Sequence, residues 1–187
     1  AGSENLAPLA EVLCEEIHRA MGIQLATGTG SPRRGDVLLQ IDPSLKDEAY
    51  TLEVKDVAVV KGGDYSSLAS GTVTLLQLLE GTVGAISVPC LSVEDRPAHP
   101  YRGLLIDLAR KYHSLGGIKQ IIELCRLYKI RYLHVHISDD QLFMFPSTKF
   151  PQVGKGNREF ARFEPASKPK IQPYTREELQ DLERFAQ

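Results

Sequence analysis

The sequence has little of several features that mark particular classes of protein. Acidic and basic residues nearly balance, and the formal net charge of −2 gives no electrostatic reason to expect a nucleic acid or an anionic membrane as partner. No apolar stretch approaches the roughly 20 residues that span a bilayer. Cys14, Cys90 and Cys125 lie far apart, so they form neither a metal-type spacing nor a disulfide framework. What remains is a composition typical of a globular protein, with 42% hydrophobic and 25% charged residues.

The first half of the chain predicts a small α+β domain. Apolar residues at helical spacing predict a helix over residues 6–21, and Gly22 is expected to end it. Strands are expected at 37–41, at 49–54 and at 57–60, the last two as a hairpin, followed by a helix at 65–79 and a strand or loop at 83–88. Helices and strands in this order predict one compact layer of each.

A change of composition separates this half from the next. Six residues are typical of a stiff, polar connector: Pro89, Asp95, Arg96, Pro97, His99 and Pro100. We therefore expect a small domain over residues 1–96 and a second domain over residues 97–187.

The second half reads as strand, helix, strand, helix. Residues 103–108 form a short apolar run, Ser114 can cap a helix, and residues 130–137 alternate as a strand does. The helix should bury five residues at helical spacing: Ile118, Ile121, Ile122, Cys125 and Tyr128. Two strands joined by a helix of this length are most simply parallel. After a long loop, Thr175 and Glu178 form a capping box that opens another helix.

Two parallel strands cannot cover their own edges. One solution is a small sheet packed on the first domain. The other, which we favour, is the truncated start of a (β/α)8 barrel, of which this chain would hold the first two β/α units.

Charged residues follow both strands of this unit. Arg110 comes after the first strand, and Asp139 with Asp140 after the second. Because active sites form at the carboxyl ends of the strands of α/β sheets and barrels, these residues should share one rim. Taken alone, Arg110 fits a surface arginine or a guanidinium fork for two hydroxyls. The aspartates fit solvated loop acids or groups that orient a sugar. The expected position of Arg110 and the two aspartates on the same rim favours a functional site.

Two histidines on one face of the second strand allow a different interpretation. His134 and His136 should point away from the helices, toward which Leu133, Val135 and Ile137 should pack. Together with Asp139 the histidines could ligate a metal. We favour the alternative, in which they are hydrogen-bonded inside the barrel, for instance to Asp107.

Two segments, Arg102-Gly-Leu-Leu-Ile-Asp-Leu-Ala-Arg-Lys-Tyr112 and His134-Val-His-Ile-Ser-Asp-Asp-Gln141, resemble glycoside hydrolase family 20, the β-N-acetylhexosaminidases. Residues 48–52 and 74–79 resemble the small domain that precedes the barrel of that family. The resemblance covers nearly the whole chain.

The resemblance implies an enzyme that releases terminal β-linked N-acetylglucosamine or N-acetylgalactosamine from glycans by substrate-assisted, retaining catalysis. No cofactor is implied. Arg110 matches the family arginine that binds the 3- and 4-hydroxyls of the sugar. Asp139 matches an aspartate that supports the site near the catalytic glutamate. Only this family resemblance suggests a compartment, which would be extracellular, periplasmic or lysosomal.

The sequence also departs from the family. The catalytic Asp-Glu pair belongs on the fourth barrel strand, and Asp47-Glu48 in the first domain cannot replace it. Leu142-Phe143-Met144 stand where the family commonly has Trp or Phe and then Arg. We therefore expect the chain to be inactive alone, with the rest of the barrel or a partner chain covering its open edge. A metal-dependent hydrolase using His134 and His136, or a non-catalytic carbohydrate-binding or scaffold module, are the alternatives.

Overall fold

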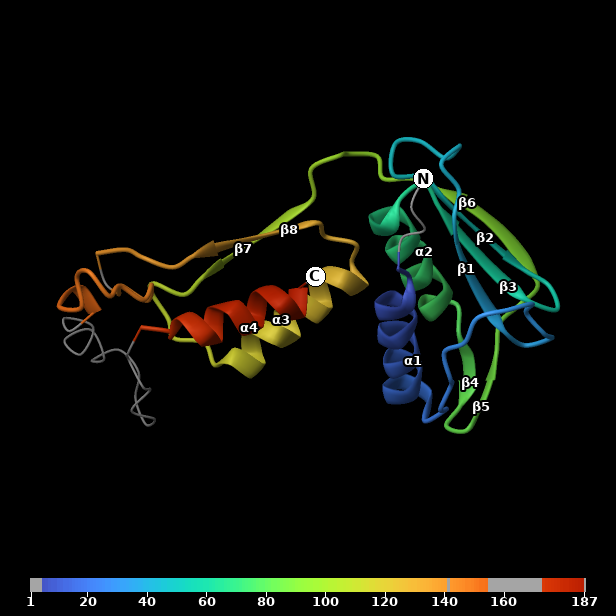
Figure 1. Cartoon of the computed structure of the whole chain (residues 1–187), viewed down its shortest axis with the longest axis horizontal. Coiled ribbons are helices and arrows are strands. Elements are labelled where there is room, and N and C mark those ends of the chain that lie inside the picture. Colours follow the sequence, from blue (N-terminus) through green and yellow to red (C-terminus); the bar gives the residue numbers. More distant parts are fainter. Residues whose placement is uncertain (1–4, 141, 155–172, 187) are drawn as a thin grey trace. The chain divides into compact units, whose positions relative to one another are not determined.

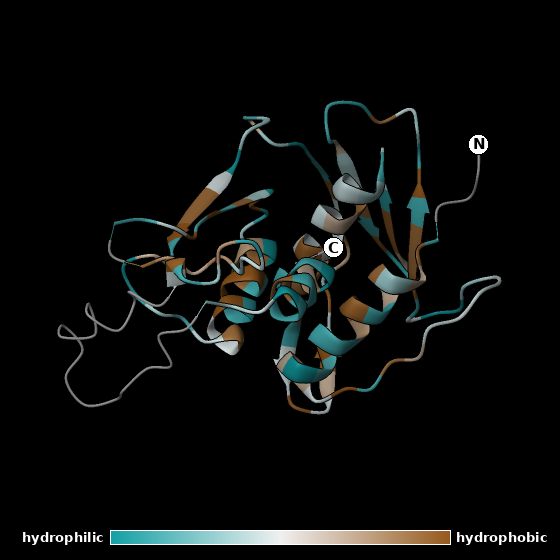
Figure 2. Cartoon of the chain, turned by 60° about the vertical axis from the view of Figure 1, so that its left-hand side comes forward, coloured by the Kyte–Doolittle hydropathy of each residue, from teal (hydrophilic) through white to brown (hydrophobic). Residues whose placement is uncertain are grey.

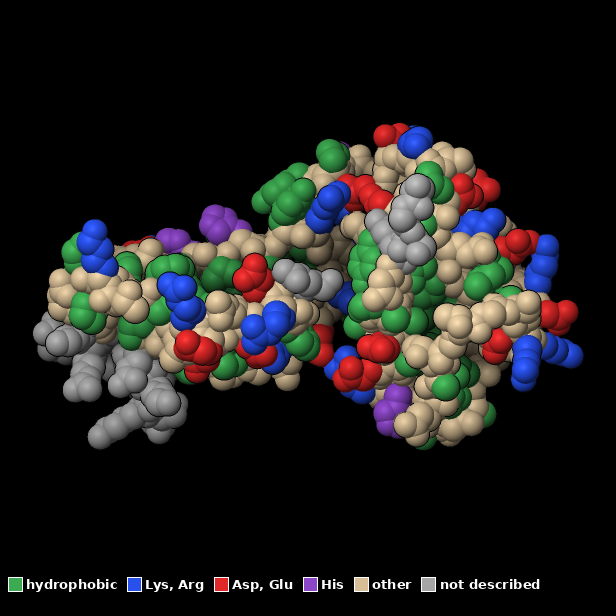
Figure 3. Space-filling model, viewed as in Figure 1, with side chains coloured by type: hydrophobic (Ala, Val, Ile, Leu, Met, Phe, Trp, Pro, Cys, Tyr) green, Lys and Arg blue, Asp and Glu red, His purple; other side chains and the backbone are tan. Residues whose placement is uncertain are grey.

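The computed structural model describes residues 5–140, 142–154 and 173–186 (Figure 1). The chain divides into two compact units, Ala1–Pro100 and Tyr101–Gln187. No helix within the described residues is both long and apolar enough to cross a membrane. Acidic and basic side chains are interspersed over the face that Figure 3 presents, as the near balance of charges would suggest.

In the first unit, two helices lie against a four-stranded sheet (Figure 1). The helices are α1 (Ala7–Met21) and α2 (Tyr65–Gln77). The strands, in their order across the sheet, are β1 (Val37–Ile41), β3 (Ala58–Gly62), β2 (Tyr50–Val54) and β6 (Leu91–Asp95). β1 pairs with β3 in parallel, whereas the β2–β3 and β2–β6 pairs are antiparallel. A separate small hairpin joins β4 (Glu80–Thr82) to β5 (Ala85–Ser87). The predicted helices and the β2–β3 hairpin are thus confirmed.

The core of this unit follows from the two periodicities of its sequence. α1 buries Leu9, Leu13 and Ile17 on one side, and β2 buries Leu52 and Val54 on one face of the sheet. The mixed character of the helices is visible in Figure 2, where hydrophobic and hydrophilic residues both occur along each of them.

One glycine sets how closely α2 approaches the sheet. A Cβ atom added at Gly71 would lie 2.6 Å from Cγ1 of Val60 on β3 and 3.1 Å from the ring of Tyr50 on β2. The first distance is shorter than real Cβ contacts and the second is tighter than most of them, so the absence of a side chain at Gly71 lets the helix pack directly on the strands.

The expected connector is partly wrong, because Leu91–Asp95 forms the edge strand β6. This strand pairs with β2 along its whole length, from Leu91 opposite Val54 to Asp95 opposite Tyr50. Leu91 and Val93 pack against the core. The flanking prolines concealed a short alternating segment, and Pro is compatible with the end of an edge strand.

A buried hydroxyl ties three elements of the first unit together. Tyr50, which is 2% exposed, shares a hydrogen bond of 2.7 Å with Oγ1 of Thr74 on α2 and donates another to the carboxylate of Asp95 on β6. Burial, together with the bond to Asp95, raises the pKa of Tyr50 to about 12. The phenol therefore stays protonated and serves as a donor at any ordinary pH.

In the second unit, β7 (Gly103–Asp107) and β8 (Tyr132–His136) pair in parallel, as predicted. Their helices α3 (Leu115–Leu127) and α4 (Arg176–Ala186) contact each other. The core that they share with the strands consists of Ile106, Leu108, Ile118, Leu142, Met144, Tyr174 and Leu182. Ser114 accepts a hydrogen bond from the N–H of Gly117, and Thr175 and Glu178 exchange the two bonds of a capping box, so both predicted helix starts are confirmed. In the described residues these two strands form an isolated pair and no closed barrel.

The predicted faces of this unit are mostly correct. Leu133 and Ile137 pack on its core, but Val135 is 37% exposed, because each strand has only one neighbour among the described residues. Tyr128 was expected to be buried and is 71% exposed. The helix ends at Leu127, and the positive φ of 55° at Lys129 then redirects the chain.

We predict that Tyr50→Phe lowers the free energy of unfolding of the first unit by about 1.5–3 kcal/mol, because it removes the hydrogen bonds that the Tyr50 hydroxyl makes with the Asp95 carboxylate and with Thr74. Urea unfolding followed by circular dichroism measures the loss. Tyr128→Phe, at a position that is 71% exposed, is the control and should change the stability by less than about 0.5 kcal/mol. Equal stability of the Tyr50→Phe variant and the wild type would show that this hydrogen bond contributes nothing net.

Candidate functional site

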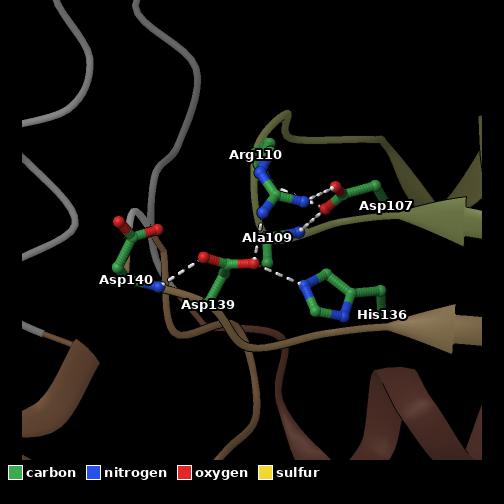
Figure 4. Close-up of polar contacts among 6 residues, drawn as sticks. All are labelled: Asp107, Ala109, Arg110, His136, Asp139 and Asp140. Atoms are coloured by element: carbon green, nitrogen blue, oxygen red, sulfur yellow. Dashed lines mark hydrogen bonds and ion pairs between the residues drawn. The ribbon is translucent and has the colours of Figure 1, made fainter.

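Four polar side chains meet where β7 and β8 end (Figure 4): Asp107, Arg110, His136 and Asp139. The parallel register pairs Asp107 with His136, so the last residues of the two strands lie side by side. Arg110 follows three residues after the first strand end, and Asp139 three residues after the second. We call this cluster the rim cluster.

Arg110 is held between two carboxylates. Its Nη1 lies 2.7 Å from Oδ2 of Asp107, and its Nη2 lies 2.7 Å from Oδ2 of Asp139. The hydrogen bond with Asp107 and the negative charge of Asp139 raise the pKa of Arg110 above its ordinary value. The side chain is nevertheless 53% exposed. The guanidinium is therefore fixed in direction while much of it stays open to a ligand.

Asp139 connects the arginine to β8. Its Oδ2 also accepts a hydrogen bond of 2.7 Å from Nε2 of His136, and its Oδ1 accepts one of 2.7 Å from the N–H of Asp140. Hydrogen bonds from Asp140 and from His136 hold the pKa of Asp139 well below its usual range. The adjacent Asp139 carboxylate in turn raises the pKa of Asp140. Because an ionised carboxylate only accepts, Nε2 of His136 must carry the proton of their bond.

Asp107 has a different pattern of bonds. Its Oδ1 accepts hydrogen bonds from the backbone N–H groups of Ala109 at 2.9 Å and of Arg110 at 3.0 Å. Its Oδ2 accepts a hydrogen bond from the side chain of Arg110. Burial alone would raise the pKa of Asp107, but the hydrogen bonds from Arg110 and Ala109 outweigh it, and the pKa lies below the ordinary 3.8.

The loops that carry these residues are tied to each other by a buried tyrosine. Tyr174 is 2% exposed, donates its hydroxyl to the carbonyl of His113 at 2.7 Å, and gives its backbone N–H to the carbonyl of Met144 at 3.0 Å. The N–H of Met144 in turn bonds to the carbonyl of Ile137 at 3.0 Å. Tyr174, just before α4, thus links the loop after β7 to the loop after β8.

Arg110 and Asp139, which the sequence analysis placed on one rim, are in direct contact. The suggested bond between Asp107 and a histidine is wrong, because Asp107 bonds to Arg110 and His136 bonds to Asp139. The sequence led us to consider His136 as a metal ligand or a structural histidine and Asp107 as its partner, but not Asp107 as a partner of Arg110. The signal was present in their spacing, since each strand ends in a polar residue that lies three positions before Arg110 or Asp139.

The histidines do not assemble a metal centre in the described part of the chain. No group of three or more His, Cys, Asp or Glu residues there is arranged to hold a metal ion. Nε2 of His136, one of the two ring nitrogens that could ligate, instead faces Asp139, and His134 is exposed.

Comparisons with known proteins match both units. The profile described as glycosyl hydrolase family 20, domain 2, matches residues 1–96, and the one described as glycosyl hydrolase family 20, catalytic domain, matches residues 99–187. A β-N-acetylhexosaminidase of Cellulomonas fimi is 38% identical over 117 residues, which are 62% of this chain and 24% of that protein. A β-hexosaminidase of Porphyromonas gingivalis is 27% identical over 204 residues, covering 98% of this chain and 25% of that protein.

Solved structures agree with these relatives. The exo-β-N-acetylglucosaminidase of Vibrio harveyi in complex with N-acetylglucosamine superposes with a TM-score of 0.82 at 29% identity, over 97% of this chain and 30% of that one. The β-N-acetylhexosaminidase of Streptomyces coelicolor gives a TM-score of 0.79 at 25% identity, over 95% of this chain and 37% of that one. The chain thus spans about a quarter of the length of the curated relatives reported above.

We predict that Asp107 and Asp139 titrate below the ordinary pKa of 3.8 and Asp140 above it, which carboxyl ¹³C NMR of the chain can measure. A carboxyl whose folded-state pKa is depressed stabilises the fold fully above its unfolded pKa, and loses that effect as the pH falls through the folded value. The Arg110→Ala variant should raise the pKa of both Asp107 and Asp139. An Asp139 that titrates at or above 3.8 would contradict the bonding described for it.

Proposed function

The chain belongs to glycosyl hydrolase family 20, and from this premise we propose that it is the N-terminal portion of a β-N-acetylhexosaminidase, an enzyme that releases terminal β-linked N-acetylhexosamines from glycans. Relatives named as hexosaminidases, and a related structure that contains N-acetylglucosamine, support this proposal. The observation that carries it is the half-exposed Arg110, fixed by two carboxylates at the carboxyl ends of two parallel strands.

The proposal includes a division of the chain. Residues 1–96 would be the small domain, and residues 97–187 the first two β/α units of a (β/α)8 barrel. Further units outside this sequence, or a partner chain, would pair with the free edges of β7 and β8 and complete the barrel. Two facts support this: the two strands pair only with each other in the described residues, and the chain covers 30% of the V. harveyi enzyme.

In this proposal Arg110 binds two neighbouring hydroxyls of the terminal sugar, the 3- and 4-hydroxyls. A planar guanidinium can offer two parallel N–H groups to adjacent oxygens. Asp107 and Asp139 already hold the guanidinium by contacts of 2.7 Å. The Arg110 side chain therefore has little orientational freedom to lose when the sugar binds.

Asp139 would support the site without giving up a proton. Its carboxyl is ionised at any pH at which a hydrolase works, since hydrogen bonds from Asp140 and His136 depress its pKa. A general acid needs the opposite environment, which raises the pKa of its carboxyl toward the working pH. The pKa of Asp107 is also depressed, so neither carboxylate of the rim cluster suits the role of general acid.

The chemistry would therefore use a glutamic acid on a later strand. It protonates the glycosidic oxygen while the acetamido oxygen of the sugar attacks the anomeric carbon, and the bond to the leaving group breaks. The aspartate before that glutamate orients the acetamido group. Water then opens the resulting oxazolinium with net retention. The residues described here would position the sugar for these steps.

We predict that Arg110→Lys in the full-length enzyme raises KM for an aryl N-acetyl-β-glucosaminide. A lysine ammonium cannot hold two hydroxyls in the geometry of a fork, and each hydrogen bond to a charged group contributes about 1.5–3 kcal/mol. The matched control is Arg184→Lys, an exposed arginine on α4 that also lies near a carboxylate, at 3.8 Å from Asp181. Unchanged kinetic constants for Arg110→Lys would mean that Arg110 does not contact the sugar.

We also predict that the 187-residue chain alone does not hydrolyse the same substrate. Loss of the general acid costs about 10²- to 10⁴-fold in rate, and loss of the groups that orient the sugar costs more. The test is an assay of the purified chain. Turnover above the blank that disappears in an Asp139→Asn variant would reveal a working site within these residues and would refute the placement of the acid elsewhere.

A further inference from the structure

We propose that Asp107 is a positioning residue, which sets the orientation of the Arg110 guanidinium and thereby the affinity of the enzyme for the terminal sugar. This inference rests on the proposed function, in which Arg110 binds the sugar. It adds a role for the last residue of β7, which would act on the sugar through Arg110.

The two oxygens of Asp107 act on the same residue in two ways. Oδ1 accepts the backbone N–H groups of Ala109 and Arg110, at 2.9 and 3.0 Å, and so fixes the turn that follows β7. Oδ2 accepts a hydrogen bond of 2.7 Å from Nη1 of Arg110 and so fixes the guanidinium end of that side chain. One carboxylate thus holds both the beginning and the tip of a long, flexible side chain.

Asp139 cannot replace Asp107 in this role. It bonds the other terminal nitrogen, Nη2, and it lies in the loop after β8, where His136 and the N–H of Asp140 also hold it. With Asp139 alone, the guanidinium could turn about its single contact. With both, each terminal nitrogen has its own carboxylate partner, and Figure 4 shows the guanidinium between Asp107 and Asp139.

Exposure indicates that the arrangement serves a ligand. The side chain of Asp107 is 29% exposed and that of Asp139 is 16% exposed, while that of Arg110 is 53% exposed. The carboxylates are thus the more buried partners, and the cation is the group presented to solvent. A surface ion pair kept only for stability would contribute little, because screening by water weakens it.

The substitution Asp107→Asn separates the two functions of the carboxylate. The amide oxygen of asparagine can still accept the two backbone N–H groups, so the turn is preserved. The amide NH₂ replaces Oδ2 and turns a donor toward the donors of Arg110. The variant should therefore keep its fold, with a Tm close to that of the wild type, and lose the orientation of the guanidinium.

In the full-length enzyme, Asp107→Asn should lower kcat/KM for the aryl N-acetyl-β-glucosaminide by roughly 10- to 100-fold, mostly through KM. In an Arg110→Ala background the same substitution should change kcat/KM by less than about twofold, since no guanidinium is left to orient. A role in the turn alone would give the same loss in both backgrounds. The control is Asp181→Asn. It likewise removes a carboxylate from an ion pair, in this case the one with Lys119 of α3 at 2.7 Å.

A second measurement needs no substrate. Crystal structures of the unliganded full-length wild type and Asp107→Asn variant should show the turn unchanged and the Arg110 guanidinium in a different orientation. An unmoved guanidinium together with unchanged KM would overturn the proposal. Failure of the proposed function would look different, because then the wild type itself would not hydrolyse the substrate, while the two crystal structures would still decide whether Asp107 orients Arg110.

Discussion

The parallel register of β7 and β8 is the constraint on which the rim cluster depends. Asp107 stands opposite His136, so the strands end at the same level and their following turns point the same way. A shift of one residue would move His136 to the helix side and bring Ile137 to the rim, because side chains alternate along a strand. The register is fixed by burial. Ile106 on β7 and Leu133 on β8, together with Leu108 and Ile137 directly after these strands, all pack on the core that the strands share with α3 and α4.

Charge then decides what the rim can do. Two carboxylates surround one guanidinium. The pKa values of both carboxyls are depressed and that of the guanidinium is raised, so these three groups stay charged over the range in which most enzymes work. Groups of constant charge suit binding and orientation, whereas proton transfer needs a group that titrates near the working pH. Under the proposed function, the rim cluster would therefore hold the sugar, and a residue outside it would supply the proton that breaks the glycosidic bond.

The elements of the fold could be predicted from the sequence where local signals are strong. The stripe of α1, the cap at Ser114, the capping box at Thr175 and the alternation around His134 all correspond to observed elements. β6 was missed because its pairing with β2 is non-local and prolines flank it. For the site, strand-end reasoning brought Arg110 and Asp139 together, but a bond such as Asp107 to Arg110 depends on turn geometry, which spacing alone does not specify.

The second unit also shows what a two-stranded parallel sheet requires. Leu105 on β7 is 55% exposed and Val135 on β8 is 37% exposed, so apolar side chains remain open on both faces of the pair. Burying apolar area of this kind is worth about 25 cal/mol per Å², and a strand edge in addition has unpaired N–H and C=O groups. Neighbouring strands would satisfy both needs at once. They would also bring other side chains to the rim beside Arg110, where the general acid of the proposed mechanism has to lie. The lack of further strand neighbours among the described residues thus accounts for the exposed aliphatic residues. In the proposed mechanism it also accounts for the lack of a suitable proton donor among the carboxylates of the rim cluster.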